Sequence, residues 1–273
     1  MNSTVGSLGD RVVQGALYVF CGMVFFYLVF PVLAIIPLSF NGGSFLSYPL
    51  AGVSLRWYRE IATSPDWIDA LWNSLIVASA TALLATLLGT LAAVGLMRLG
   101  ERTRSALTLL LLSPLFVPVI VTAVAVYLLY AALGLANTYT GLVLADTTLA
   151  APFVIIVVRA ALQGFDSNLL RAGASLGAPP RMVLARVLVP LVAPGVLAGA
   201  VFAFMTSFDE TVVAIFLAGP TRRTLPLQMF EGVRDEISPA ITAVTTVLIV
   251  TSACLFLLVE LLRRHSWQTR VSV

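Results

Sequence analysis

The sequence predicts an all-α membrane protein with six transmembrane helices, and three observations support this. Of its 273 residues, 59% are hydrophobic and 11% are charged, which leaves more apolar surface than a soluble domain of this length can bury. The apolar residues gather in six runs, each long enough to cross a bilayer as a helix of roughly 20 residues. Most of the 16 basic residues, all of them arginine, lie between these runs. The runs are Val12–Leu38, Leu71–Met97, Leu107–Ala132, Gly141–Leu162, Leu191–Leu217 and Ala240–Leu262.

The arginines also predict which way the chain is inserted. With six spans both termini lie on one side, and that side carries eleven arginines against five on the other. Cytoplasmic loops carry the excess of basic residues, so we expect both termini and the polar interval 166–190 in the cytoplasm. The first run is then a retained signal-anchor helix, and 1–273 is one transmembrane domain.

The outer loops are expected at 39–70 and 219–239. The first contains SLRWYREI, residues 54–61, which can form a short helix at the membrane boundary, where Trp57 and Tyr58 are stable. The second mixes acidic residues and arginines and is typical of a solvated loop.

Each middle span has its own signature. The second is rich in alanine and glycine, which let helices approach closely. The third carries Pro114 and Pro118, which remove helix hydrogen bonds and predict a kink or short break. The fourth has Asp146 near its start and Pro152 inside. The cysteines, Cys21 and Cys254, lie in separate apolar runs, where we expect them to pack in the interior.

The fifth span holds two acids, Asp209 and Glu210, about 27 Å from its start at Leu191. An acid inside a membrane costs about 2.5–3.5 kcal/mol, so it faces a cavity or a partner and not lipid. One interpretation is that Asp209, helped by Glu210, Thr206 and Ser207, offers negative charge to a cationic substrate. The other is a structural hydrogen bond or ion pair to a neighbouring span or subunit.

The interval 166–190, DSNLLRAGASLGAPPRMVLARVLVP, predicts two short helices separated by Gly177, Pro179 and Pro180. Leu169, Ala172 and Leu176 share one side of the first helix, as a helix that docks in a partner's groove requires. The chain shows no metal-ligand spacing, nucleophile triad, phosphate-binding glycine loop or dinucleotide fingerprint. We therefore expect no catalytic residue, no metal and no cofactor in this chain.

This interval resembles the EAA loop of binding-protein-dependent ABC importer permeases. Arg171, Ala172 and Gly173 stand in the Glu-Ala-Ala position, Gly177 is the loop's glycine and Pro190 its proline. Arg171 replaces the acid of that pattern. Further short matches resemble the polyamine and opine branch of the family, namely SLRWY at 54–58, Asn73-Ser74-Leu75, Pro152-Phe153-Val154, Ser207-Phe208-Asp209-Glu210 and Thr224-Leu225-Pro226.

The resemblance implies the type I ABC importer permease fold, with cytoplasmic coupling helices, in a bacterial inner membrane. It also implies two ATP-binding subunits that carry ATP and Mg, a second permease subunit and an external solute-binding protein, with no nucleic acid. The substrate implied is a small amine such as a polyamine, an opine, an aminophosphonate or an amino acid. Two alternatives stay open: a self-sufficient secondary transporter or channel that couples to ions through its intramembrane acids, and a purely structural subunit of a membrane complex.

Overall fold

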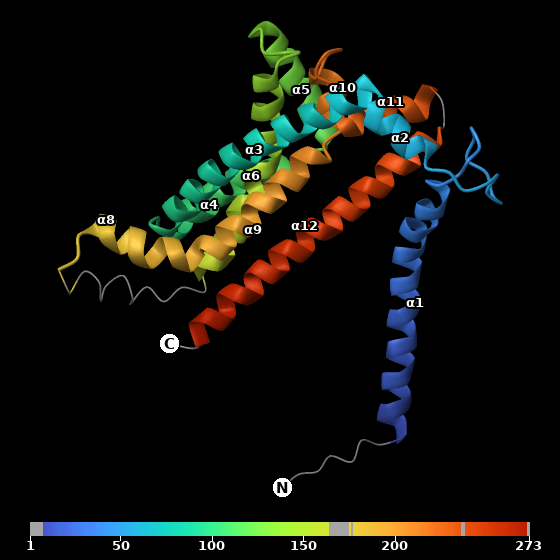
Figure 1. The fold of residues 1–273 in the computed structure, drawn as a ribbon. Coiled ribbons are helices and arrows are strands. Elements are labelled where there is room, and N and C mark those ends of the chain that lie inside the picture. Colours follow the sequence, from blue (N-terminus) through green and yellow to red (C-terminus); the bar gives the residue numbers. More distant parts are fainter. Residues whose placement is uncertain (1–7, 164–174, 176, 236–237, 272–273) are drawn as a thin grey trace. The chain divides into compact units, whose positions relative to one another are not determined.

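The computed structural model describes residues 8–163, 175, 177–235 and 238–271. This part of the chain is helical and contains no β-strand, only an isolated bridge between Asn41 and Val53 (Figure 1). The chain divides into two compact units. One consists of Met1–Thr63 with Gly232–Leu255, and the other of Ser64–Glu231 with Phe256–Val273.

The first unit contains α1 (Leu8–Leu38), the short helix α2 (Arg56–Thr63) and the first half of α12 (Pro239–Val271). The predicted short helix at 54–61 is therefore confirmed as α2. It is anchored by Trp57, which is buried against Ala240 and Ala243 of α12.

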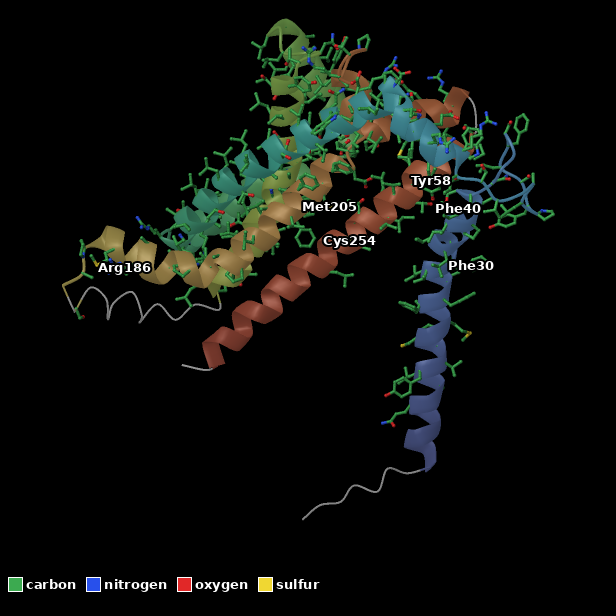
Figure 2. All side chains as sticks on the ribbon, in the orientation of Figure 1. Phe30, Phe40, Tyr58, Arg186, Met205 and Cys254 are labelled. Atoms are coloured by element: carbon green, nitrogen blue, oxygen red, sulfur yellow. The ribbon has the colours of Figure 1, made fainter. Side chains whose placement is uncertain are left out.

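The loop between α1 and α2 closes on α2 through polar contacts. The indole Nε1–H of Trp57 donates to the Asn41 carbonyl at 2.8 Å. The hydroxyls of Ser39 and Tyr58 are 2.6 Å apart, and the rings of Phe40 and Tyr58 lie with centroids 5.3 Å apart (Figure 2). These contacts make the loop between α1 and α2 an ordered cap on α2.

The second unit is built on three long helices that lie side by side (Figure 1): α3 (Pro65–Met97), α6 (Tyr139–Gln163) and α9 (Val189–Phe208). Val154 of α6 is fully buried between two glycines. A Cβ atom at Gly89 of α3 would lie 2.8 Å from the Val154 Cβ, and one at Gly199 of α9 would lie 3.2 Å from its Cγ1. The glycines therefore permit an approach that any larger residue prevents.

The predicted break in the third span is confirmed. Helix α4 (Glu101–Leu112) ends in a 3₁₀ turn, η1 (Ser113–Leu115), and α5 (Val119–Ala132) leaves at 92° to it. Pro114 and Pro118 lie at the bend. Neither can donate to the helix hydrogen-bond ladder, and this accounts for the bend.

The fifth span differs from its prediction as one helix over 191–217. Helix α8 (Pro180–Val183) continues through a π-helical turn, η2 (Leu184–Leu188), into α9, which ends at Phe208. A separate helix, α10 (Val212–Leu217), follows. The 20 residues of α9 extend for about 30 Å, which suffices to cross the hydrocarbon core. The chain leaves helical geometry at residues 209–211, between α9 and α10.

The prediction of a solvated loop over 219–239 is wrong for its middle part, which forms α11 (Leu225–Asp235). Leu225, Pro226 and Leu227 at its start are buried. This helix was not predicted because the local sequence shows only a short hydrophobic patch among charged residues. The face that α11 buries is determined by neighbours that are distant in sequence.

The segment that leads into α11 is fastened to α3. The Asn73 side-chain amide donates to the Arg223 carbonyl at 2.9 Å, and the backbone N–H of Leu225 donates to the Ser74 hydroxyl at 2.7 Å. The Tyr139 hydroxyl in turn donates to the Asn73 amide oxygen at 2.6 Å. Buried Asn73 thus joins α3, α6 and the 219–224 segment.

Four helices among the described residues are long and apolar enough to span a membrane singly: α1, α3, α6 and α9. The bent pair of α4–η1 and α5 gives a fifth span if its two halves cross together. The apolar part of α12 covers Pro239–Cys254. The expectation that Cys21 and Cys254 pack inside the fold is wrong, because both side chains are exposed.

Candidate functional site

The break after α9 places the two predicted acids outside a regular helix. Asp209 is the C-terminal cap of α9, with φ −94° and ψ 0°, and its backbone N–H donates to the Met205 carbonyl at 3.1 Å. Met205, one turn before Asp209, marks this end of α9 in Figure 2. The side chain of Asp209 is exposed. It is therefore a carboxylate presented at the end of a membrane-crossing helix.

Glu210 has a different role in the geometry. Its carboxylate oxygen Oε1 accepts a hydrogen bond from the backbone N–H of Val213 at 2.9 Å. That N–H belongs to the first turn of α10, which has no intrahelical partner for it. A carboxylate is also favoured there by the helix dipole. Glu210 is half-buried and caps α10, which leaves Asp209 as the more accessible acid.

A third acid, Asp146 of α6, belongs to the same region and was missed as a site residue. The sequence prediction placed it at the edge of its span, but α6 begins seven residues earlier and Asp146 is 4% exposed. The Ser207 hydroxyl donates to its carboxylate oxygen Oδ2 at 2.5 Å. An acid one turn inside an apolar run was the available signal, since such a residue requires a partner.

The four predicted substrate-path residues, Thr206, Ser207, Asp209 and Glu210, lie together at the end of α9. Their environments differ: Ser207 is buried and bound to Asp146, Thr206 and Glu210 are half-buried, and Asp209 is exposed. Among the described residues no group of three or more histidine, cysteine, aspartate or glutamate side chains could hold a metal ion.

The predicted docking stretch is described only in its second half. Leu169, Arg171, Ala172, Gly173 and Leu176 lie outside the described residues. Gly177 has φ +77°, a left-handed conformation that favours glycine and fits its predicted role after a helix. Pro190 stands in the first turn of α9, where proline is tolerated.

The second predicted helix of this stretch is present as α8 and η2. Arg186 and Met182 are exposed, whereas Val183 and Leu188 are buried (Figure 2 labels Arg186). This segment therefore has one face fixed in the fold and one face free to meet a partner.

A groove of about 660 Å³ lies between α3 and α9. Its lining is mostly apolar and includes Leu83, Leu87 and Phe204, with two threonines, Thr86 and Thr90. The hydroxyl oxygens of both threonines are buried and make no hydrogen bond within the described part of the chain. A membrane-embedded hydroxyl without a partner favours a neighbour that supplies one.

A protein family matches residues 85–268: the binding-protein-dependent transport system inner membrane component. The chain belongs to this family. It is a helical, multi-pass inner-membrane permease of an ABC importer.

Curated relatives match most of this permease. It is 33% identical over 248 residues to the spermidine/putrescine transport system permease protein PotC of Haemophilus influenzae, covering 90% of this chain and 96% of PotC. It is 32% identical over 232 residues to the putrescine transport system permease protein PotI of Escherichia coli (strain K12), covering 82% of each.

The fold is shared with solved ABC importers. A chain of a bacterial ABC transporter involved in the import of the acidic polysaccharide alginate superposes with a TM-score of 0.70. The match covers 96% of this permease and 99% of that chain at 14% identity. At this identity the likeness concerns the fold alone, which is that of type I ABC importer permeases.

Proposed function

We propose that this permease lines the path of an ATP-driven importer that brings a small amine into the cytoplasm by alternating access. The substrate class is a polyamine such as spermidine or putrescine, or a related opine, aminophosphonate or amino acid. The exposed Asp209 carboxylate at the end of α9 is the observation that carries the proposal. The names of the relatives PotC and PotI support it.

A cationic substrate explains why an acid is kept at this position. A carboxylate in a membrane-embedded segment is costly unless it meets a cavity or a partner. Charge-assisted hydrogen bonds to an ammonium group contribute about 1.5–3 kcal/mol. Because Glu210 is engaged as a cap, Asp209 is the acid with free acceptor capacity, and Thr206 lies one turn back to supply a neutral oxygen.

The proposed topology has six crossings, with both termini in the cytoplasm. It takes α1, α3, α6 and α9 as single crossings, α4–η1 with α5 as one bent crossing, and α12 as the last. The distribution of the arginines, eleven on one side and five on the other, supports this orientation.

We place energy coupling at residues 166–190. The importer contains two permeases and two ATP-binding subunits, which carry the ATP and Mg. One ATP-binding subunit docks at this loop of each permease. The residues expected to meet those subunits are Leu169, Arg171, Ala172, Gly173 and Leu176, which lie outside the described residues, together with Gly177 and Pro190. The direct continuation from α8 through η2 into α9 supports the proposal, since a displacement of α8 is passed to α9 through consecutive helical turns. Reverting Arg171 to the acid, Arg171→Glu, and measuring ATP hydrolysis per substrate moved tests this docking.

The remaining partners are assigned to surfaces that the described part of this chain leaves uncovered. A second, homologous permease covers the mostly apolar groove between α3 and α9. An external solute-binding protein meets the outer regions 39–70 and 219–239, where α2 and α11 are ordered.

The deciding experiment is uptake by the complete reconstituted importer with saturating binding protein. Asp209→Asn is expected to lower spermidine uptake about tenfold, because one charge-assisted contact of about 1.5 kcal/mol is lost. Glu101→Gln is the matched control, since it removes the same charge at an exposed residue that pairs with Arg104. Equal uptake by wild type and Asp209→Asn at equal membrane levels would overturn the assignment.

The same preparation separates this function from a secondary transporter. Uptake must stop when ATP hydrolysis is blocked and must continue in the presence of an uncoupler. The reverse pattern would indicate ion coupling through the intramembrane acids.

A further inference from the structure

Asp146 is a buried carboxylate for which the proposed path has no use. It lies on α6 with 4% of its surface exposed, so substrate does not reach it. Its hydrogen-bond donor is Ser207, which is itself 5% exposed and stands two residues before Asp209. The link therefore joins a fixed helix to the turn that presents the exposed acid.

The Ser207 hydroxyl has an alternative that it does not take. Hydroxyls inside helices commonly donate to the carbonyl four residues back. Thr147 does so to Val143, and Thr246 does so to Thr242. Ser207 instead donates across to Asp146 at 2.5 Å, a hydrogen bond that selects one rotamer and joins the last turn of α9 to α6.

The backbone of the break depends on that same last turn. The carbonyl of Ser207 accepts from the N–H of Glu210 at 3.2 Å, which closes the turn containing Phe208 and Asp209. On the far side, the Glu210 carboxylate holds the first turn of α10. Asp209 therefore lies between Ser207 and Glu210, which are both held by hydrogen bonds, and its own side chain is exposed.

We propose that Asp146 is a positioning residue for the substrate path: by holding Ser207, it fixes the helix break so that the Asp209 carboxylate is presented to the passing amine. The inference rests on the proposed function. Asp146 itself touches no substrate and acts only through Ser207. Three acids in one region then have three separate roles, with Asp146 orienting, Glu210 capping and Asp209 meeting the substrate.

The position of residue 209 can be measured without transport. In the complete importer with Cys21→Ser and Cys254→Ser, Asp209→Cys leaves one thiol in this chain, and the rate at which this chain is labelled by a positively charged methanethiosulfonate reports the presentation of residue 209. Ser207→Ala and Asp146→Ala are each expected to change that rate at least threefold. Asp146→Asn is expected to leave it within twofold, since the carboxamide oxygen accepts the same proton.

Thr148→Ala is the matched control. It removes a hydroxyl from the same helix that donates to its own Leu144 carbonyl, and its side chain is exposed. It should leave the labelling rate unchanged. If Ser207→Ala fails to assemble, Asp146→Ala still tests the proposal, because Ser207 can then donate within its own helix.

Uptake gives the second arm. With Asp209 intact, Asp146→Ala is expected to lower spermidine uptake at least threefold at equal membrane level. In an Asp209→Asn background it should lower uptake no further, since its effect passes through Asp209.

Equal labelling of residue 209 in all variants, or an equal loss of uptake in both backgrounds, would overturn the positioning role. If the single substitution Asp209→Asn leaves uptake equal to that of the wild type, the result instead contradicts the proposed function. The labelling result still decides the positioning of residue 209 in that case.

Discussion

Replacing Gly89 of α3 by alanine places a methyl group where Val154 of α6 already lies. The new Cβ would be 2.8 Å from both Cβ and Cγ1 of Val154, and 3.2 Å from the Ala151 carbonyl oxygen. Carbon atoms pack at about 3.5–4.0 Å, so the overlap is about 0.7–1.2 Å. Both Val154 atoms lie at or next to the backbone, and a rotamer change cannot relieve the contact.

The loss of stability caused by Gly89→Ala is best measured relative to the variant Gly95→Ala. Gly95 lies on the same helix and has no atom within 4 Å of its added Cβ. Both substitutions gain about 0.5–1 kcal/mol from exchanging glycine for alanine in a helix, and this gain cancels in the comparison. The remaining difference is the cost of overpacking, about 1–3 kcal/mol.

The assay is thermal unfolding of the purified importer in detergent, followed by the loss of the monodisperse size-exclusion peak. One kcal/mol shifts Tm by roughly 2–4 °C in a domain of this size, so Gly89→Ala should melt about 2–12 °C below Gly95→Ala. Equal Tm values for Gly89→Ala and Gly95→Ala would show that the three helices are not interlocked at Val154.

Three further predictions use the same melting assay. Ser207→Ala should lower Tm more than Asp146→Ala, because it strands a buried carboxylate at about 1–3 kcal/mol, and the double variant should melt above Ser207→Ala alone; the opposite ranking would contradict the buried hydrogen bond. Asn73→Leu should cost about 2–3 kcal/mol through two lost hydrogen bonds and should speed trypsin cleavage after α10; unchanged cleavage argues against the fastening. Trp57→Phe should cost about 1–2 kcal/mol, since a buried carbonyl loses its donor. Trp72→Phe, at an exposed position, should leave Tm unchanged. If Trp72→Phe lowers Tm as much as Trp57→Phe does, the hydrogen bond of Trp57 does not account for the loss.

The long apolar helices could be predicted because hydropathy over 20 residues is a local property of the sequence. Proline chemistry is also local, so the bend near Pro114 and Pro118 was predicted correctly. The short helix α2 was found for a similar reason, since its aromatic residues mark a membrane boundary.

The breaks that depend on distant contacts could not be predicted. No helix-breaking residue stands around Asp209, so the end of α9 could not be predicted; Glu210 instead caps the next helix, α10. The burial of α11 likewise depends on Asn73 and Ser74, about 150 positions away along the chain. The pairing of Asp146 with Ser207 joins two spans, whereas periodicity describes only one helix at a time.

The packing of Val154 between Gly89 and Gly199 has a mechanical consequence. A valine seated between two glycines resists sliding of α3 or α9 along α6, because any axial shift brings a larger neighbour against it. We therefore expect the three helices to move together, so that a displacement at the η2 end of α9 is passed along about 30 Å of helix toward Asp209. The change of shape is left to the joints, at the 92° bend before α5 and at the three residues after Phe208.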